Sequence, residues 1–193
     1  MSIASRLVNV WLRTLLTIWR ARVLLRRRGP IPPSSVGRIR LRTLPTDIDL
    51  LGHMNNGRYA SLFDLGRFDL LIRTGIWDAM AAQDWYAVVA SETVTFRKSL
   101  ALWQRFTVES RLYGHDDKAV YQIHRAVVRG EVYAEMIVRA RFLRKGGGVV
   151  NTEELFAALH RPDDLPPLPE WITEWAAASA LPSTKAPAPS VWD

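Results

Sequence analysis

Apolar and polar residues recur with two different periods along the chain, and these periods predict helices and strands in a definite order. Apolar positions at helical spacing predict helices over residues 3–28 and 58–74. Alternating or continuous β-branched and aromatic residues predict strands over residues 36–44, 85–96, 105–113, 119–128 and 131–144. One helix after the first strand, followed by an antiparallel meander, is an α+β pattern. It predicts a curved sheet wrapped around one central helix.

Breaks in this pattern divide the chain into three parts. The segment GPIPPSS at residues 29–35 separates an N-terminal helix and linker (residues 1–35) from the domain that follows (residues 36–160). Residues 161–193 form a tail with a helical turn around Trp171 and Trp175, and the domain is expected to end in a short helix at residues 152–160. The last part of the tail, LPSTKAPAPS, has the low complexity of a disordered segment.

The net charge of +7 belongs to one end of the chain. Ten of the 26 basic residues lie in residues 1–42, which hold no acidic residue. Residues 43–193 therefore hold 16 basic and 19 acidic residues, a net charge of −3. A nucleic-acid-binding domain spreads basic charge over its folded face, so nucleic acid is not an expected partner. The chain has no cysteine, and its four histidines have no metal-site spacing, so no metal site is expected.

The N-terminal helix combines an arginine stripe with a wide apolar surface. Its arginines recur every seven residues, at Arg6, Arg13, Arg20 and Arg27, and Thr17 joins the stripe. Trp11 and Trp19 lie among the apolar positions, as in helices that rest in a membrane interface with arginines reaching the phosphates. Packing on the chain's own domain or on a partner subunit is the alternative, and a cleaved organellar targeting peptide also fits an acid-free start. Three charged residues interrupt the apolar run, so no membrane-spanning helix is expected.

Candidate chemistry is concentrated in DIDLLGHMNNGRY, residues 47–59, between the first strand and the central helix. This segment holds Asp47, Asp49, His53, Asn55 and Asn56 just before a helix start. A helix N-terminus presents free N–H groups that stabilise negative charge, which suits a developing oxyanion. A nearby carboxylate can activate water or attack directly. The alternative is that the aspartates are turn residues and the asparagines only cap the helix.

The pattern D-x-D-x-x-G-H-x-N-N-x-x-Y, followed by the helix ASLFDLGRFDLLIRTG, resembles the hot-dog-fold acyl-CoA thioesterases of the 4-hydroxybenzoyl-CoA-thioesterase-like group. The likeness covers residues 36–145 and includes the later strands ETVTFRKSLALWQRFTVESRLYGHDDKAVYQ. Among these proteins, the sequence is most similar to the group related to thioesterase-superfamily member six. The resemblance implies a hot-dog fold, here with an extra N-terminal helix.

The resemblance also implies roles for individual residues. Asp49 matches the catalytic carboxylate, which acts as nucleophile or as general base. Asn56 lies where a backbone N–H meets the thioester carbonyl. His53 falls where some hot-dog thioesterases have a catalytic histidine, although Leu51 replaces the asparagine that those enzymes place between the two residues. The residues expected to contact substrate are Asn55, Gly57, Tyr59 and Asp64, of which Asp64 matches a helix carboxylate used by another hot-dog subgroup.

These observations predict a cytoplasmic enzyme of lipid metabolism that hydrolyses the thioester of an acyl-CoA or an acyl carrier protein. It would need no metal or organic cofactor, with coenzyme A entering only as part of the substrate. The resemblance implies a homodimer or tetramer, and residues 3–28 suggest peripheral membrane contact. The alternative function is a non-catalytic hot-dog protein that binds acyl-CoA or lipid at a membrane surface. A hot-dog hydratase or dehydratase ranks third, because Asp49 and His53 are four apart without an intervening asparagine.

Overall fold

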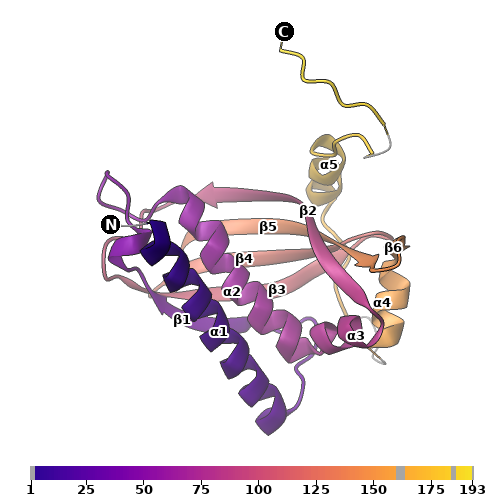
Figure 1. Cartoon of the computed structure of the whole chain (residues 1–193), viewed down its shortest axis with the longest axis horizontal. Coiled ribbons are helices and arrows are strands. Elements are labelled where there is room, and N and C mark those ends of the chain that lie inside the picture. The colour runs from indigo at the N-terminus through magenta and orange to yellow at the C-terminus, as the bar shows by residue number, and fades with distance from the viewer. Residues whose placement is uncertain (1–2, 160–163, 184–185, 193) are drawn as a thin grey trace.

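The computed structural model describes residues 3–159, 164–183 and 186–192, and a curled antiparallel sheet forms its centre (Figure 1). The strands are β1 (Gly37–Arg42), β2 (Trp85–Phe96), β3 (Arg105–His115), β4 (Val120–Val128), β5 (Glu131–Arg144) and the short β6 (Val149–Val150). Their spatial order is β1-β3-β4-β5-β2, with β6 paired to β5. Helix α2 (Asn56–Thr74) lies across the concave face, so the predicted hot-dog fold is confirmed.

Helix α2 packs closely on the middle of the sheet because its sequence leaves room there. Leu62 and Phe63 are buried in the main core cluster together with Val108 and Met136 of the sheet. A Cβ atom at Gly66 would lie only 2.3 Å from the Ser110 hydroxyl oxygen, so glycine permits this close approach. The helix ends at Gly75, whose φ of +87° is the left-handed conformation that glycine adopts readily at a helix C-terminus.

The predicted meander of four strands is wrong at its first strand. β2 pairs antiparallel with β5 at the far edge of the sheet and does not pair with β3, so only β3, β4 and β5 form a meander. The sequence carries tight hairpin signals at residues 114–118 and 129–131 but none at residues 97–104, which agrees with a connection from β2 at one edge to β3, next to the other edge. Helix α3 (Ile76–Ala82) was not predicted.

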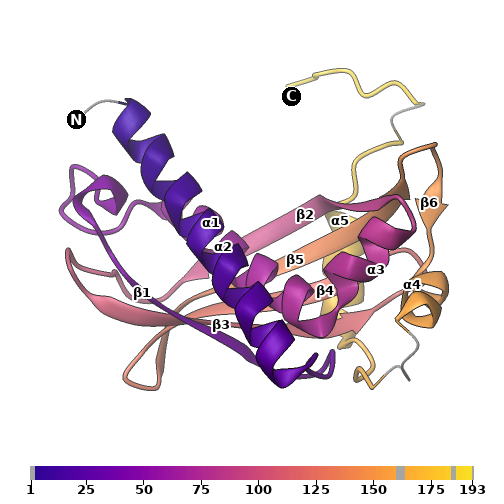
Figure 2. The same cartoon turned by 60° about the horizontal axis from the view of Figure 1, so that its bottom comes forward.

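Helix α1 (Ile3–Arg28) has the predicted bounds and packs beside α2, as Figures 1 and 2 show from two directions. The middle of the predicted stripe faces the chain's own domain: Thr17 is buried, as is the neighbouring Ala21, and Arg13 and Arg20 bind aspartates there, whereas Arg27 is exposed. The expectation that these two arginines reach lipid phosphates is therefore wrong. A guanidinium is attracted more strongly to a buried aspartate than to a phosphate at an exposed surface, because water screens the buried charge pair less.

The C-terminal part contributes two short helices. α4 (Thr152–Ala158) and α5 (Glu170–Ala178) confirm the predicted short helix and the helical turn around Trp171 and Trp175, while His160 lies outside the described residues. Ile172 of α5 packs with Tyr121 and Ile123 on the sheet face opposite α2. No helix within the described ranges is long and apolar enough to cross a membrane.

Candidate functional site

The segment predicted to carry chemistry forms a tight loop in front of α2. After a 3₁₀ turn at Pro45–Asp47, Ile48 pairs with Met54 across the loop, and the Asp49 amide donates to the His53 carbonyl at 3.0 Å. Gly52 closes the turn with a φ of +79°, and its amide donates to the Asp49 carbonyl at 3.2 Å. The loop therefore holds Asp49 and His53 opposite each other.

Asp47 holds this loop in place through buried hydrogen bonds. Its side chain is fully buried and accepts hydrogen bonds from Arg13 (3.0 Å), Arg58 (2.9 Å) and the Leu44 amide (2.9 Å). Its backbone carbonyl accepts from the Asn55 amide at 2.8 Å. With both oxygens occupied by guanidinium groups, Asp47 serves the structure of the loop.

Asp49 lies in a more open environment. Its side chain is 22% exposed, and Oδ1 accepts a hydrogen bond from the Leu51 amide at 2.9 Å. His53 Nδ1 lies 3.8 Å from the same oxygen, so the two side chains are neighbours without a short hydrogen bond. No guanidinium bonds Asp49 within the part of the chain that the structure describes. Asp49 thus keeps acceptor capacity that Asp47 has lost.

The first turn of α2 leaves one amide unused. Asn55 is the N-cap: its side-chain oxygen accepts from the Gly57 amide at 2.9 Å, and its carbonyl accepts from the Arg58 amide at 2.9 Å. The Asn56 amide has no acceptor among the described residues. A free N–H at a helix N-terminus is suited to bind an anionic or polarised oxygen. This is the position at which the sequence predicted contact with a thioester carbonyl.

Tyr59 and Asp64, both predicted to contact substrate, lie further along α2. Tyr59 is buried beside Phe63 and Phe96, and burial raises the pKa of its hydroxyl, opposed by a hydrogen bond with the Leu100 backbone. Its ring belongs to the core, and its contact with substrate stays a prediction.

Asp64 pairs with Arg67 one turn along the helix at 2.8 Å, as expected for a helix ion pair. Burial raises the pKa of its carboxyl, which Arg67 opposes and the nearby Glu92 of β2 reinforces. A carboxyl with a raised pKa beside a second carboxylate is a feature of catalytic sites. Glu92 was not singled out from the sequence, because nothing local in β2 marks it as facing α2.

A cavity of about 420 Å³ lies between α2, α3 and strands β2 and β5. Its wall is mainly apolar and aromatic, with Phe68, Leu71, Trp77, Met80, Trp85, Tyr86 and Val88 among the lining residues. Two lining side chains are polar and have an unbonded buried atom, Arg67 Nη1 and Gln122 Oε1. No local sequence pattern marks this cavity, because its lining comes from segments spread between residues 67 and 145.

The structure therefore brings some predicted site residues together and separates others. Asp49, His53, Asn55, Asn56 and Gly57 meet at the start of α2. Asp64 lies two turns along the helix, next to Arg67 of the cavity wall, and the lining of that cavity does not include the Asp49 loop. No group of three histidine, cysteine, aspartate or glutamate side chains is arranged to hold a metal within the described ranges.

Comparison with known proteins gives one consistent family. Residues 43–176 match a family model described as the thioesterase-like superfamily. Protein THEM6 of Xenopus laevis is 30% identical over 171 residues, which cover 88% of this chain and 80% of that protein.

Solved structures share the fold at lower identity. YbaW of Escherichia coli, described as a probable thioesterase, has a TM-score of 0.60 at 21% identity, over 63% of this chain and 95% of YbaW. SAV2348 of Staphylococcus aureus, solved in complex with CoA, has a TM-score of 0.56 at 17% identity, over 74% of this chain and 94% of that one. Both likenesses agree with the curled sheet and the central helix.

Proposed function

Because the chain belongs to the thioesterase-like superfamily, we propose that it hydrolyses the thioester bond of an acyl-CoA or of an acylated carrier protein. The observation that carries the proposal is a partly exposed carboxylate, Asp49, on the loop that leads into α2, together with the unbonded Asn56 amide at the start of that helix. A polarising N–H donor and a nearby carboxylate are what thioester hydrolysis requires. The CoA bound to SAV2348 favours coenzyme A as the carrier.

In the proposed reaction, the Asn56 amide and the α2 dipole stabilise the negative charge that develops on the thioester oxygen. Asp49 either accepts a proton from the attacking water or attacks the carbonyl carbon itself, forming an anhydride that water then cleaves. The carbon–sulfur bond breaks, the thiolate takes a proton, and a carboxylic acid is released. His53, 3.8 Å from Asp49, would orient the carboxylate. Water is the only co-reactant, so the proposal includes no metal ion or organic cofactor.

The apolar cavity beside α2 is the proposed place for the acyl group. Its volume of about 420 Å³ falls within the usual range for small-molecule sites. Asp64 and Glu92 lie near its Arg67 wall, which makes Asp64 a second carboxylate to test.

We also propose that two copies of the chain complete this site. Strand β2 is a 12-residue edge strand with Tyr86, Val89 and Phe96 exposed, and such an edge is a template for pairing. The cavity is lined by β2, so a partner strand at this edge would extend its wall. Leu50 and Leu51 at the loop tip are also exposed and would be available to the partner.

The experiment measures release of free thiol by purified protein from a panel of aliphatic and aromatic acyl-CoA substrates, with and without a chelator. We expect turnover that the chelator does not change. Asp49→Asn keeps the acceptor for the Leu51 amide and is expected to lower kcat by about 10²–10⁴-fold. The matched control is Asp117→Asn, which removes a carboxylate that is 77% exposed, far from α2 in sequence.

The outcomes separate the alternatives. Full activity in Asp49→Asn with loss in Asp64→Asn would move the catalytic carboxylate to the middle of α2. Tight acyl-CoA binding without hydrolysis by the wild type would refute the enzyme and favour the non-catalytic binding function.

A further inference from the structure

Helix α1 presents its apolar side outward. Five large residues, Trp11, Leu12, Leu15, Leu16 and Trp19, are each between 55% and 66% exposed. The middle of the polar stripe, in contrast, is turned inward, where Arg13 and Arg20 bind buried aspartates. A surface helix normally buries its apolar stripe and exposes its charges. The reversed arrangement of α1 leaves a continuous apolar surface without a partner among the described residues.

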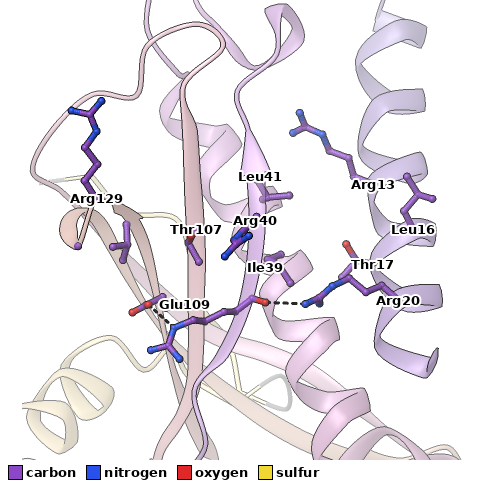
Figure 3. A pocket seen from close by; sticks show the side chains of 13 residues that line it. Arg13, Leu16, Thr17, Arg20, Ile39, Arg40, Leu41, Thr107, Glu109 and Arg129 are labelled. Carbon is purple, nitrogen blue, oxygen red and sulfur yellow. Dashed lines mark hydrogen bonds and ion pairs between the residues drawn. The ribbon is translucent and has the colours of Figure 1, made fainter. Parts of the chain in front are cut away.

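A basic groove lies directly beside this surface. It has a volume of about 880 Å³ and runs between α1 and the outward side of β1 and β3 (Figure 3). Leu16 lines it from the helix, while Arg38, Arg40 and Arg129 line it from the sheet side. A neighbouring hollow of about 750 Å³ shares several of these residues and adds Arg42 and Arg105. The groove and the apolar side of α1 therefore meet at Leu16.

The groove has an excess of positive charge. The one carboxylate among its lining residues, Glu109, is already bonded to Arg38 at 2.8 Å (Figure 3). Arg40, Arg42, Arg105 and Arg129 have no carboxylate partner in the described part of the chain. Arg42 and Arg105 also lie directly opposite each other in the β1–β3 register, where like charges are destabilising. A bound anion would relieve this repulsion.

We propose that α1 and the basic groove form one surface that binds an anionic phospholipid bilayer. The apolar side chains enter the interface between head groups and acyl chains, and Arg40, Arg42, Arg105 and Arg129 of the groove and the neighbouring hollow meet the phosphates. No described helix is long and apolar enough to span a membrane, so α1 lies in the plane of the interface. Lipid binding of this kind is independent of the proposed hydrolysis, and its phosphate contacts come from these four arginines in place of Arg13 and Arg20, which are bonded to aspartates.

The charges disfavour the other occupants of such a surface. In a two-fold contact between copies of the chain, the same patch occurs on both sides. Two patches with an excess of positive charge would then be brought together. A nucleic acid would neutralise the groove but would leave five large apolar side chains in water. A phospholipid bilayer with anionic head groups would bury the apolar side chains of α1 and neutralise the arginines beside them.

The test uses the full chain and vesicle co-sedimentation, with phosphatidylcholine vesicles compared with vesicles that also contain phosphatidylglycerol. We expect binding to the phosphatidylglycerol vesicles that weakens as salt is raised. The double substitution Leu15→Gln with Trp19→Gln should lower the partition coefficient at least about 10-fold. Its control, Trp171→Gln, changes a tryptophan that is 48% exposed on α5, whose buried residues pack on the other sheet face. The control should bind like the wild type.

The charge contribution is tested separately with Arg40→Gln and Arg42→Gln. Each should lower binding to the anionic vesicles by about 5-fold and leave binding to phosphatidylcholine unchanged. Lys145→Gln, a 66% exposed cation at the end of β5, is the matched control. Equal binding to both vesicle types, or no binding to either, would overturn the proposal. An oligomer that Leu15→Gln with Trp19→Gln dissociates would instead identify a second copy as the occupant.

Discussion

Two aspartates in one loop, Asp47 and Asp49, have opposite surroundings although one residue separates them. Asp47 is fully buried and bound by two guanidinium groups, whereas Asp49 is partly exposed and has the His53 ring nitrogen at 3.8 Å as its neighbour. The two aspartates of the DIDLLGHMNNGRY motif therefore have separate roles. One carboxylate fixes the loop to α1 and α2, and the other is left able to accept a proton or attack a carbon.

Asp47 belongs to a wider set of buried ion pairs that we call the ion-pair layer. Its members are Arg13, Asp47 and Arg58 around one turn of α1, and Arg20, Asp69 and Arg73 about two turns further along that helix. Arg13 and Arg20 also donate to the carbonyls of Arg42 and Arg38, at 2.9 and 3.2 Å. These bonds satisfy carbonyl oxygens on the free edge of β1, which would otherwise need another partner. The basic charge of α1 therefore stabilises the fold.

The largest expected effect follows from removing the buried member of the aspartate pair. Asp47→Ala would leave Arg13 and Arg58 without their carboxylate and the Leu44 amide without its acceptor. Breaking a buried ion pair from one side costs about 3–5 kcal/mol. We expect the free energy of unfolding, measured with urea, to fall by that amount.

Asp78→Ala provides the control for this measurement. Asp78 of α3 pairs with Arg22 of α1, but the Asp78 side chain is 52% exposed. Exposed pairs contribute about 0–1 kcal/mol, so this variant should unfold close to the wild type. Equal destabilisation by both substitutions would mean that burial does not distinguish the two pairs.

The two histidines extend the comparison to pH. His53 is open, whereas His124 is fully buried, with Nδ1 2.8 Å from the Ser110 hydroxyl oxygen. Burial, reinforced by the charge of Arg67, lowers the pKa of His124 to about 3. A lowered pKa contributes stability that is present above the unfolded value of 6.5 and is lost as pH falls from there toward 3. At pH 5 the loss is about 2 kcal/mol relative to pH 7.

His124→Gln should remove most of this pH dependence, because glutamine does not titrate and can still bond the Ser110 hydroxyl. The measurement is urea unfolding at pH 7 and pH 5 for both proteins. An NMR titration gives an independent check, since the ring protons of His124 should not shift between these pH values. A His124 signal that titrates near 6.5 would contradict its assignment as a buried neutral side chain.

The sequence predicted local structure well because local signals decide it. Residues 3–28 lack glycine and proline, and α1 occupies those residues. The orientation of α1 was not predictable, because it depends on Asp47 and Asp69, which lie 34 and 49 positions from Arg13 and Arg20. The pairing of β2 with β5 is equally long-range, and no residue within β2 specifies its partner.

The same limit applies to the candidate site. The motif located the loop, and Asn55 caps α2 as one of the two asparagines suggested for that role. No local feature of the motif distinguishes the buried Asp47 from the open Asp49. The choice of Asp49 as the catalytic carboxylate came from the family resemblance. The apolar cavity, with Arg67 and Gln122 on its wall, forms only when α2, α3 and the edge of the sheet come together.

Substituting the two asparagines at the start of α2 is expected to have smaller and unequal effects on stability. Asn55→Ala removes the side-chain acceptor of the Gly57 amide, and loss of such a cap costs about 1 kcal/mol. Asn56→Ala should change stability by less than about 0.5 kcal/mol, because that side chain is exposed and only its backbone amide enters the proposal. Thermal unfolding of both variants checks this difference. A larger loss in Asn56→Ala would indicate that its side chain supports the loop.

Asp49→Asn is expected to change stability as little as Asn56→Ala does, and it is the most direct test of the difference between Asp47 and Asp49. Asparagine keeps an oxygen for the Leu51 amide, so the substitution removes only the charge beside His53. On a partly exposed loop we expect the free energy of unfolding to change by less than about 0.5 kcal/mol. Thermal unfolding and thiol release should be measured on the same preparation. Loss of turnover without loss of stability separates a reactive carboxylate from a structural one. A destabilisation comparable to that of Asp47→Ala would instead place Asp49 with the ion-pair layer, and lost activity would then follow from a disturbed loop.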